Sequence, residues 1–358
     1  LIKGATIDDE WSVSIVPKIS EKMIFNGSIF RIRLKSKYNP YFIVVFMGTK
    51  YFLLQKTRAI SNTGIYYNDK NSLENFLIPI PSPEIQKYIG DKVRRAEELR
   101  EEAKKLKEEM AKKLYLAIGL PGNLEDNNDK YSFVQNEHLD DIRIDAIYYM
   151  KKYIEYSNKL NEKELVRLGD IIKDSRYGAS ISANYCKTGI PFLRGLNLKE
   201  NEINDNIVYL NESVRDEIGK AIVNEGDILI TRSGSVGITA VVDERQEGYV
   251  FGSFMIKLVI DKEMWNPYYI SAFLNSFWGK WQIERQKNGA VQQNINLQEI
   301  DRIMVPKIDL NKQKTFEILI KEYIGNEIKS KQLIQEAKQD VEDLIEGNFD
   351  MSKLNKTE

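Results

Sequence analysis

Two long charged segments carry apolar residues at alternating spacings of three and four. The first runs from residue 84 to about residue 116, and the second runs from residue 312 to about residue 345. A narrow apolar stripe of this kind predicts two helices that pair as a coiled coil, although two independent amphipathic surface helices would show a similar pattern. The expected seam residues are Ala96, Leu99, Ala103, Leu106 and Met110 in the first helix and Ile334, Ala337, Val341 and Leu344 in the second.

Shorter patterns precede each long helix. Alternating and β-branched residues predict strands at 29–34 and 255–260. An Asn-Pro pair then opens a predicted helix over 41–55 in one place and over 268–286 in the other, since Pro suits the first helical turn. An apolar stretch ending in Pro79 or Pro306 predicts one further strand in each place.

These patterns belong to an internal repeat. Asn39-Pro40-Tyr41 resembles Asn266-Pro267-Tyr268, and 266 minus 39 is 227. The same offset relates Pro79 to Pro306 and Gln86 to Gln313, so a duplicated unit is expected. The counterpart of Val166 would fall before residue 1, and the chain starts with Leu, so we expect the first unit to lack its N-terminal part.

The repeat and the polar linker that follows Gly119 divide the chain. We expect a partial first globular domain, a first long helix, a linker, a second globular domain, a second long helix and a tail. The corresponding residues are 1–83, 84–118, 119–137, 138–307, 308–346 and 347–358.

Composition favours a binding protein over an enzyme. Fifty-two Lys and Arg balance 53 Asp and Glu, so any surface that binds a polyanion must be local. The lone Cys186 excludes an internal disulfide and a multi-cysteine zinc site, and the lone His138 leaves little imidazole chemistry. We therefore expect a cytoplasmic protein without a metal site, and no apolar run reaches the ~18–20 residues that would span a membrane.

Three segments of the second unit carry a family resemblance. They are Val166-Arg-Leu-Gly-Asp170, Gly189-Ile-Pro-Phe-Leu-Arg-Gly-Leu-Asn197 and Gly226-Asp-Ile-Leu-Ile-Thr-Arg-Ser-Gly234. With the duplication, they make the chain resemble the DNA-specificity subunit of type I restriction-modification systems. The resemblance implies an α/β (α+β) fold in which two pseudo-repeated target recognition domains are joined by a pair of long antiparallel coiled-coil helices.

The same resemblance implies a function and its partners. Each recognition domain would read half of a split site in double-stranded DNA, and the helices would set the spacing. The chain would have no catalytic activity and bind no cofactor. It would assemble with two methyltransferase (modification) subunits and with restriction/translocase subunits, which would hold S-adenosylmethionine, ATP and Mg. The DNA target does not follow from the resemblance.

Polar loops supply the candidate DNA-binding residues. The segment 285–294 offers Arg and Lys for phosphate or guanine and amides for adenine, and 56–67 is its basic counterpart in the first copy. A solvated connecting loop is the alternative in both places, and a plain β-turn is the alternative to DNA contact at 231–237. The candidates are Arg232, Ser233, Ser235, Arg285, Lys287, Asn288, Gln292, Gln293, Asn294, Tyr177, Lys187, Arg194, Arg58, Asn62, Tyr66 and Tyr67.

Other functions stay open from the sequence. Asn39-Pro40-Tyr41 and Asn266-Pro267-Tyr268 could be compared with the Asn-Pro-Pro-Tyr loop of amino-methyltransferases, but both lack the second Pro, which favours helix capping. The chain could also be the C-terminal recognition region of a fused restriction-methyltransferase. A coiled-coil assembly protein that does not bind DNA is the alternative from another class.

Overall fold

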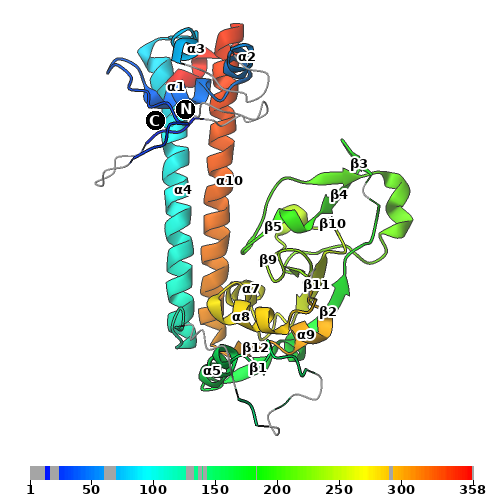
Figure 1. The fold of residues 1–358 in the computed structure, drawn as a ribbon. Helices are drawn as coiled ribbons and strands as arrows, with labels where there is room; N and C mark the ends of the chain where they lie inside the picture. Colours follow the sequence, from blue (N-terminus) through cyan, green and yellow to red (C-terminus); the bar gives the residue numbers. More distant parts are fainter. Residues whose placement is uncertain are drawn as a thin grey trace. The chain divides into compact units, whose positions relative to one another are not determined.

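Two long helices connect the parts of this chain (Figure 1). The structure is a computed structural model and describes residues 13–16, 24–59, 70–125, 133–135, 139, 143–182, 184–289 and 293–356. Helix α4 spans Pro83–Ile118 and helix α10 spans Leu310–Glu346, which confirms both predicted helices. The chain forms two compact units: unit 1 contains Leu1–Lys104 and Gly325–Glu358, and unit 2 contains Lys105–Ile324.

Unit 1 is built from helices around one apolar cluster. Helices α1 (Pro40–Phe46) and α2 (Lys50–Arg58) bury Phe42, Phe46 and Phe52 against the start of α4. Phe52 also contacts Phe46 and Phe76 edge to face, with ring centroids 5.8 and 5.0 Å apart. The remaining elements of unit 1 are α3 (Lys70–Glu74) and the 3-10 helix η5 (Met351–Lys356).

The two long helices pair through the predicted seam. In unit 1, Ala96 packs in one cluster with Ile334, Ala337 and Val341, and Lys92 forms an ion pair with Asp340 at 2.6 Å. In unit 2, the Lys107 ammonium lies 4.6 Å from the Tyr323 ring centroid. The later residue in α4, Lys107, contacts the earlier residue in α10, Tyr323, so the helices are antiparallel. Leu99 and Ala103 are also buried, whereas Leu106, Met110 and Leu344 are partly exposed.

Two predicted strands of the first copy do not form. In the described part of unit 1, neither Ile29–Leu34 nor Phe76–Pro79 forms a strand, although Ile29 makes an isolated β-bridge, and Ile29, Ile32 and Leu34 are each 37% exposed. Their counterparts in unit 2 are strands because other strands pair with them. In unit 2, Met255–Ile260 pairs with Ile172–Tyr177 and with Ile228–Thr231, and Met304–Pro306 pairs with Leu165–Arg167. The predicted helix over 41–55 is also wrong in one respect, since it is interrupted between α1 and α2.

All strands in the described part of the chain lie in unit 2. One sheet has the order β2 (Ile172–Tyr177), β11 (Met255–Ile260), β8 (Ile228–Thr231) and β9 (Thr239–Val241), with all neighbours antiparallel. A second sheet has the order β10 (Val250–Phe251), β4 (Ile190–Leu193), β7 (Val208–Leu210) and β3 (Tyr185–Cys186). Strand β11 occupies the predicted range Met255–Ile260 and pairs with both β2 and β8. The remaining strands are β1 (Leu165–Arg167), β5 (Leu198–Lys199), β6 (Glu202–Ile203) and β12 (Met304–Pro306).

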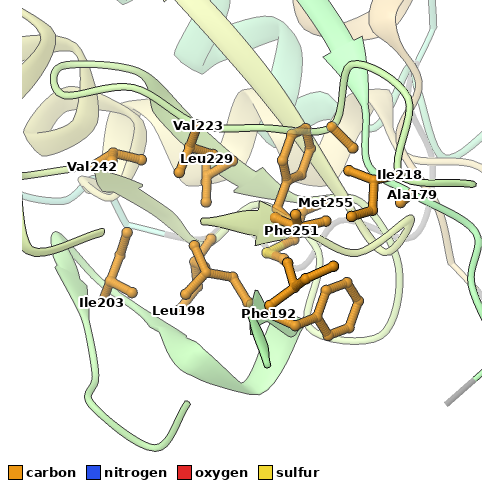
Figure 2. Packing of buried hydrophobic residues seen from close by; sticks show 14 of the residues in the cluster. Ala179, Phe192, Leu198, Ile203, Ile218, Val223, Leu229, Val242, Phe251 and Met255 are labelled. Carbon is orange, nitrogen blue, oxygen red and sulfur yellow. The ribbon is translucent and has the colours of Figure 1, made fainter. Parts of the chain in front are cut away.

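The two sheets share an apolar core. Strand β8 is buried along its whole length, and Leu229 packs with Val223, Val242, Phe251 and Met255 (Figure 2). This core fixes the ends of β8 and β11, from which polar loops emerge.

Short helices complete unit 2. The predicted helix over 268–286 is divided into α7 (Pro267–Leu274) and α8 (Phe277–Gln286), as its counterpart is in unit 1. The other helices are α5 (Lys151–Leu160), α6 (Leu168–Ile171), α9 (Leu297–Asp301), and the 3-10 helices η2 (Gly195–Asn197), η3 (Glu212–Glu217) and η4 (Glu244–Gln246).

The repeat extends to individual hydrogen bonds. The Asn39 amide donates to Gln86 Oε1 at 3.1 Å, and the Asn266 amide donates to Gln313 Oε1 at 2.8 Å. Each Asn side chain also accepts from the amide two residues later, which confirms that both Asn-Pro-Tyr segments cap helices. In both copies, a Gln near the start of the long helix therefore fixes the start of a short helix.

The ends of the long helices repeat a second contact. The Lys50 amide at the start of α2 donates to Glu342 Oε1 at 3.3 Å, and the Phe277 amide at the start of α8 donates to the Tyr115 hydroxyl at 3.3 Å. Both donors and both acceptors differ by 227 positions. The two units thus share one arrangement although the accepting side chains differ.

Candidate nucleic-acid interface

The loop between β8 and β9 is a turn held by its own backbone. The Gly237 amide donates to the Thr231 carbonyl at 2.8 Å, and the Ile238 amide donates to Thr231 Oγ1 at 2.9 Å. Gly234 and Gly237 have φ values of +77° and +93°, which favour glycine. The amides of 236–238 are therefore used inside the turn and do not form a phosphate cradle.

A second loop lies against this turn. Asn288 and Asn294 exchange backbone hydrogen bonds of 2.8 Å in both directions and so close the loop between them. Ser233 forms a β-bridge with Asn294, and the Ile295 amide donates to the Arg232 carbonyl at 3.0 Å. The two segments predicted separately to contact DNA thus form adjacent parts of one surface.

Arg232 and Tyr177 meet on the same surface. The Arg232 guanidinium lies 4.7 Å from the centroid of the Tyr177 ring, and Tyr177 is 42% exposed at the end of β2. Among the described residues, Arg232 has no carboxylate partner, and its Nε atom is buried without a hydrogen bond. Arginine in this situation can bind phosphate or a guanine edge.

Phe254 is an exposed aromatic residue that is not among the candidates predicted from the sequence. Its carbonyl accepts from the Arg232 amide at 2.9 Å, and its side chain is 57% exposed. The sequence feature that could have identified it is an aromatic residue in the short turn between β10 and β11. We call Tyr177, Arg232, Phe254, Asn288 and Asn294 the loop surface.

A buried carboxylate supports the loop surface from below. Glu299 is 6% exposed, and it accepts from the Asn288 side-chain amide and, at 2.8 Å, from the Asn296 backbone amide. Burial raises the pKa of Glu299, and the nearby Arg143 opposes this shift. Sequence reasoning missed both residues, although Asn296-Leu-Gln-Glu299 has the spacing of a capping box.

The prediction that Arg285 lies in an exposed loop is wrong. It lies in the last turn of α8 and not in a loop. Its guanidinium donates to the Tyr148 carbonyl and to Ser157 Oγ, each at 2.9 Å, and lies 4.0 Å from the Tyr148 ring centroid. Lys287, which follows α8, forms an ion pair with Glu284 at 2.5 Å. The expected exposed loop therefore begins only at Asn288.

Two further candidates lie on the second sheet. The Arg194 guanidinium lies 5.5 Å from the Tyr185 ring centroid and donates to the Asn206 carbonyl at 3.1 Å. Lys187 is exposed in the connection that follows β3. Neither residue has a described contact with the loop surface.

The remaining candidates have different positions. Ser235 and Gln293 are exposed beside the loop surface, and Ser233 is half-buried. Arg58 is exposed as the last residue of α2, so the expected loop over 56–67 begins inside a helix, where Lys56 is buried. Four candidates lie outside the described residues: Asn62, Tyr66, Tyr67 and Gln292.

In the described part of the chain, no group of three or more His, Cys, Asp or Glu side chains is arranged to hold a metal ion. None of the described helices has the length and apolar character needed to cross a bilayer.

Comparison with known proteins gives consistent results. A family model, "Type I restriction modification DNA specificity domain", matches residues 160–339, which are 180 of the 358 residues. The "Putative type I restriction enzyme MjaX specificity subunit" of Methanocaldococcus jannaschii is 24% identical over 205 residues, covering 54% of this chain and 48% of the relative. The chain thus spans about half the length of this curated relative.

Two solved structures also match this chain. The type I restriction-modification S subunit from M. genitalium has a TM-score of 0.50 at 14% identity, covering 87% of this chain and 72% of that one. The HsdS subunit from Thermoanaerobacter tengcongensis has a TM-score of 0.36 at 17% identity, covering 87% and 71%.

Proposed function

The chain belongs to the family of type I restriction-modification DNA specificity domains, and from this premise we propose that it recognises a DNA sequence on behalf of a restriction-modification complex. The observation that carries the proposal is the loop surface. Tyr177, Arg232 and Asn294 come from three separate segments and lie together around one turn. An arginine, two amides and two exposed aromatic rings are side chains that can contact phosphates and base edges.

We also propose that the DNA site is bipartite. The paired hydrogen bonds Asn39–Gln86 and Asn266–Gln313 support this, because they indicate that the two units derive from one recognition module. A duplicated module joined by paired helices suits two half-sites at a defined separation.

We propose that the catalytic activities of the complex belong to partner subunits. This chain would be non-catalytic and would scaffold two modification subunits, which would bind S-adenosylmethionine. Restriction/translocase subunits would use ATP and Mg. Methyl transfer to DNA by the purified chain alone would contradict this part of the proposal.

The central test is DNA binding by the full chain in complex with its modification subunits. Sites are selected from random duplexes, and binding is measured by fluorescence anisotropy at several salt concentrations. Affinity should fall steeply with salt, because phosphate contacts release counterions. Asn294→Ala should cost ~1–3 kcal/mol of discrimination if the amide reads a base.

Arg232→Ala distinguishes two kinds of contact. Loss of a guanine contact would relax sequence preference at one position, whereas loss of a phosphate contact would weaken all sequences alike. Arg215→Ala is the matched control, since Arg215 is exposed on η3 and pairs with Glu212. Absence of salt-dependent DNA binding would favour the coiled-coil assembly protein, and unchanged preference in both variants would exclude the loop surface.

A further inference from the structure

Unit 2 contains a pocket that the proposed DNA binding does not use. Its volume is about 520 Å³, and it lies beside α5, α8 and the β1–β12 pair. Three arginines line it, Arg167, Arg285 and Arg302, together with Tyr148, Trp281 and Met304. Pockets of ~300–1,000 Å³ are typical of small-molecule sites.

The charged residues that line the pocket are all arginines. No carboxylate is among its lining residues, which are all described, and arginine stays protonated in proteins. Two carboxylates outside the lining interact with these arginines: burial raises the pKa of Glu299 and of Asp301, and Arg302 and Arg167, respectively, oppose these shifts. Three guanidinium groups around one cavity favour an anionic ligand, and their planar donors match phosphate in particular.

One arginine is already held in place. Arg285 is fixed by the Tyr148 carbonyl, the Ser157 hydroxyl and the Tyr148 ring. Its side chain therefore loses little freedom when a ligand binds, which favours affinity. The contacts that hold Arg285 away from the loop surface therefore place its guanidinium where a different ligand can bind it.

Two polar atoms in the pocket lining lack partners. Trp281 Nε1 and Gln286 Oε1 are buried without a hydrogen bond among the described residues, and both residues are 7% exposed. Unpaired buried polar atoms are costly, and an indole N–H can only donate. An anionic ligand with a hydroxyl group would satisfy both atoms.

We propose that this pocket binds a small phosphorylated molecule of about mononucleotide size. The phosphate would contact the three arginines, and the body of the ligand would lie against Trp281 and Met304. This site is separate from the loop surface and does not depend on DNA recognition. Gln286 immediately precedes Lys287 and Asn288, so an occupied pocket would lie next to the base of the loop.

The test uses isothermal titration of the full chain with adenosine 5′-monophosphate, inorganic phosphate and adenosine in phosphate-free buffer. The monophosphate should bind saturably, inorganic phosphate more weakly, and adenosine at least tenfold more weakly than the monophosphate. Indole ¹⁵N NMR follows the same titration, and the Trp281→Phe variant identifies the Trp281 signal, which should shift.

Substitutions of the pocket arginines test whether the monophosphate binds in the pocket. Arg167→Gln and Arg302→Gln should each weaken monophosphate binding at least tenfold, whereas Arg215→Gln, with the same charge change elsewhere in unit 2, should not. Amide NMR spectra check that each variant is folded. The proposal is overturned if neither phosphate compound binds, if adenosine binds as well as its monophosphate, or if Arg215→Gln has an equal effect.

Discussion

Glu299 connects the buried interior of unit 2 to the loop surface. Its two carboxylate oxygens accept from opposite ends of the segment 288–296, one from the Asn288 side chain and one from the Asn296 amide. Arg143 Nη1 lies 3.9 Å from the first of these oxygens and donates to the Gln286 carbonyl at 2.8 Å. A residue that does not itself reach the surface therefore fixes the loop that does.

Replacing Glu299 should loosen this loop. In Glu299→Ala, Asn288 and Asn296 lose their acceptor, and each lost bond to a charged group is worth ~1.5–3 kcal/mol. Hydrogen exchange at the amides of Asn288 and Asn294 should accelerate, and Glu299→Gln, which keeps one acceptor oxygen, should have a smaller effect. Exposed Glu247→Ala is the control, and unchanged exchange in Glu299→Ala would contradict a positioning role.

The same residue predicts a pH effect on stability. Burial raises the pKa of folded Glu299 above its ordinary value of 4.5, so the folded state binds more protons between the two values. The free energy of unfolding contributed by Glu299 should therefore fall as pH rises through that window. Urea unfolding from pH 4 to 7 should show that wild type loses stability relative to Glu299→Gln as pH rises. An opposite slope would mean that hydrogen bonds to the carboxylate outweigh its burial.

At the scale of elements, substitution of the repeated Gln can test whether the same contact stabilises both units. Gln86 bonds the Asn39 amide and the Pro81 carbonyl, and Gln313 bonds the Asn266 amide and the Ile308 carbonyl. Substitution by Leu keeps the volume but leaves two backbone groups without partners in each unit.

Gln86→Leu and Gln313→Leu should each destabilise one unit by ~1–3 kcal/mol for the unpaired groups. Hydrogen exchange should accelerate in α1 for the first variant and in α7 for the second, with little effect on the other unit. Gln339→Leu, on the exposed face of α10, is the control. Equal acceleration in both helices by either variant would show that the units unfold together.

How much of the structure the sequence predicts depends on where partners lie along the chain. The long helices and β11 were predicted because their patterns are local and long. Ile29–Leu34 has a strand pattern without a strand, since a strand also needs neighbours to pair with. Arg285 was assigned to a loop because residues distant in sequence, Tyr148 and Ser157, determine its role. The β-bridge between Ser233 and Asn294 is likewise a tertiary contact that no local pattern contains.

At the scale of the whole molecule, the long helices belong to both units. Helix α4 begins in unit 1 and ends in unit 2, and α10 does the reverse. The boundaries lie between Lys104 and Lys105 and between Ile324 and Gly325. A change of length at these two points would alter the connection while leaving the described contacts within each unit intact.

Inserting seven residues at both boundaries should lengthen the gap between the proposed half-sites. Seven residues keep the spacing of three and four in the seam and add ~10.5 Å to each helix. DNA advances ~34–36 Å in 10–10.5 base pairs, so the preferred gap should grow by about three base pairs while the half-sequences stay the same. Site selection from random DNA, with the variant in complex with its modification subunits, measures the gap. An insertion in α4 alone is the control, because it puts the antiparallel seam out of register and should reduce stability. If the doubly inserted protein folds and selects the original gap, the paired helices do not set the spacing.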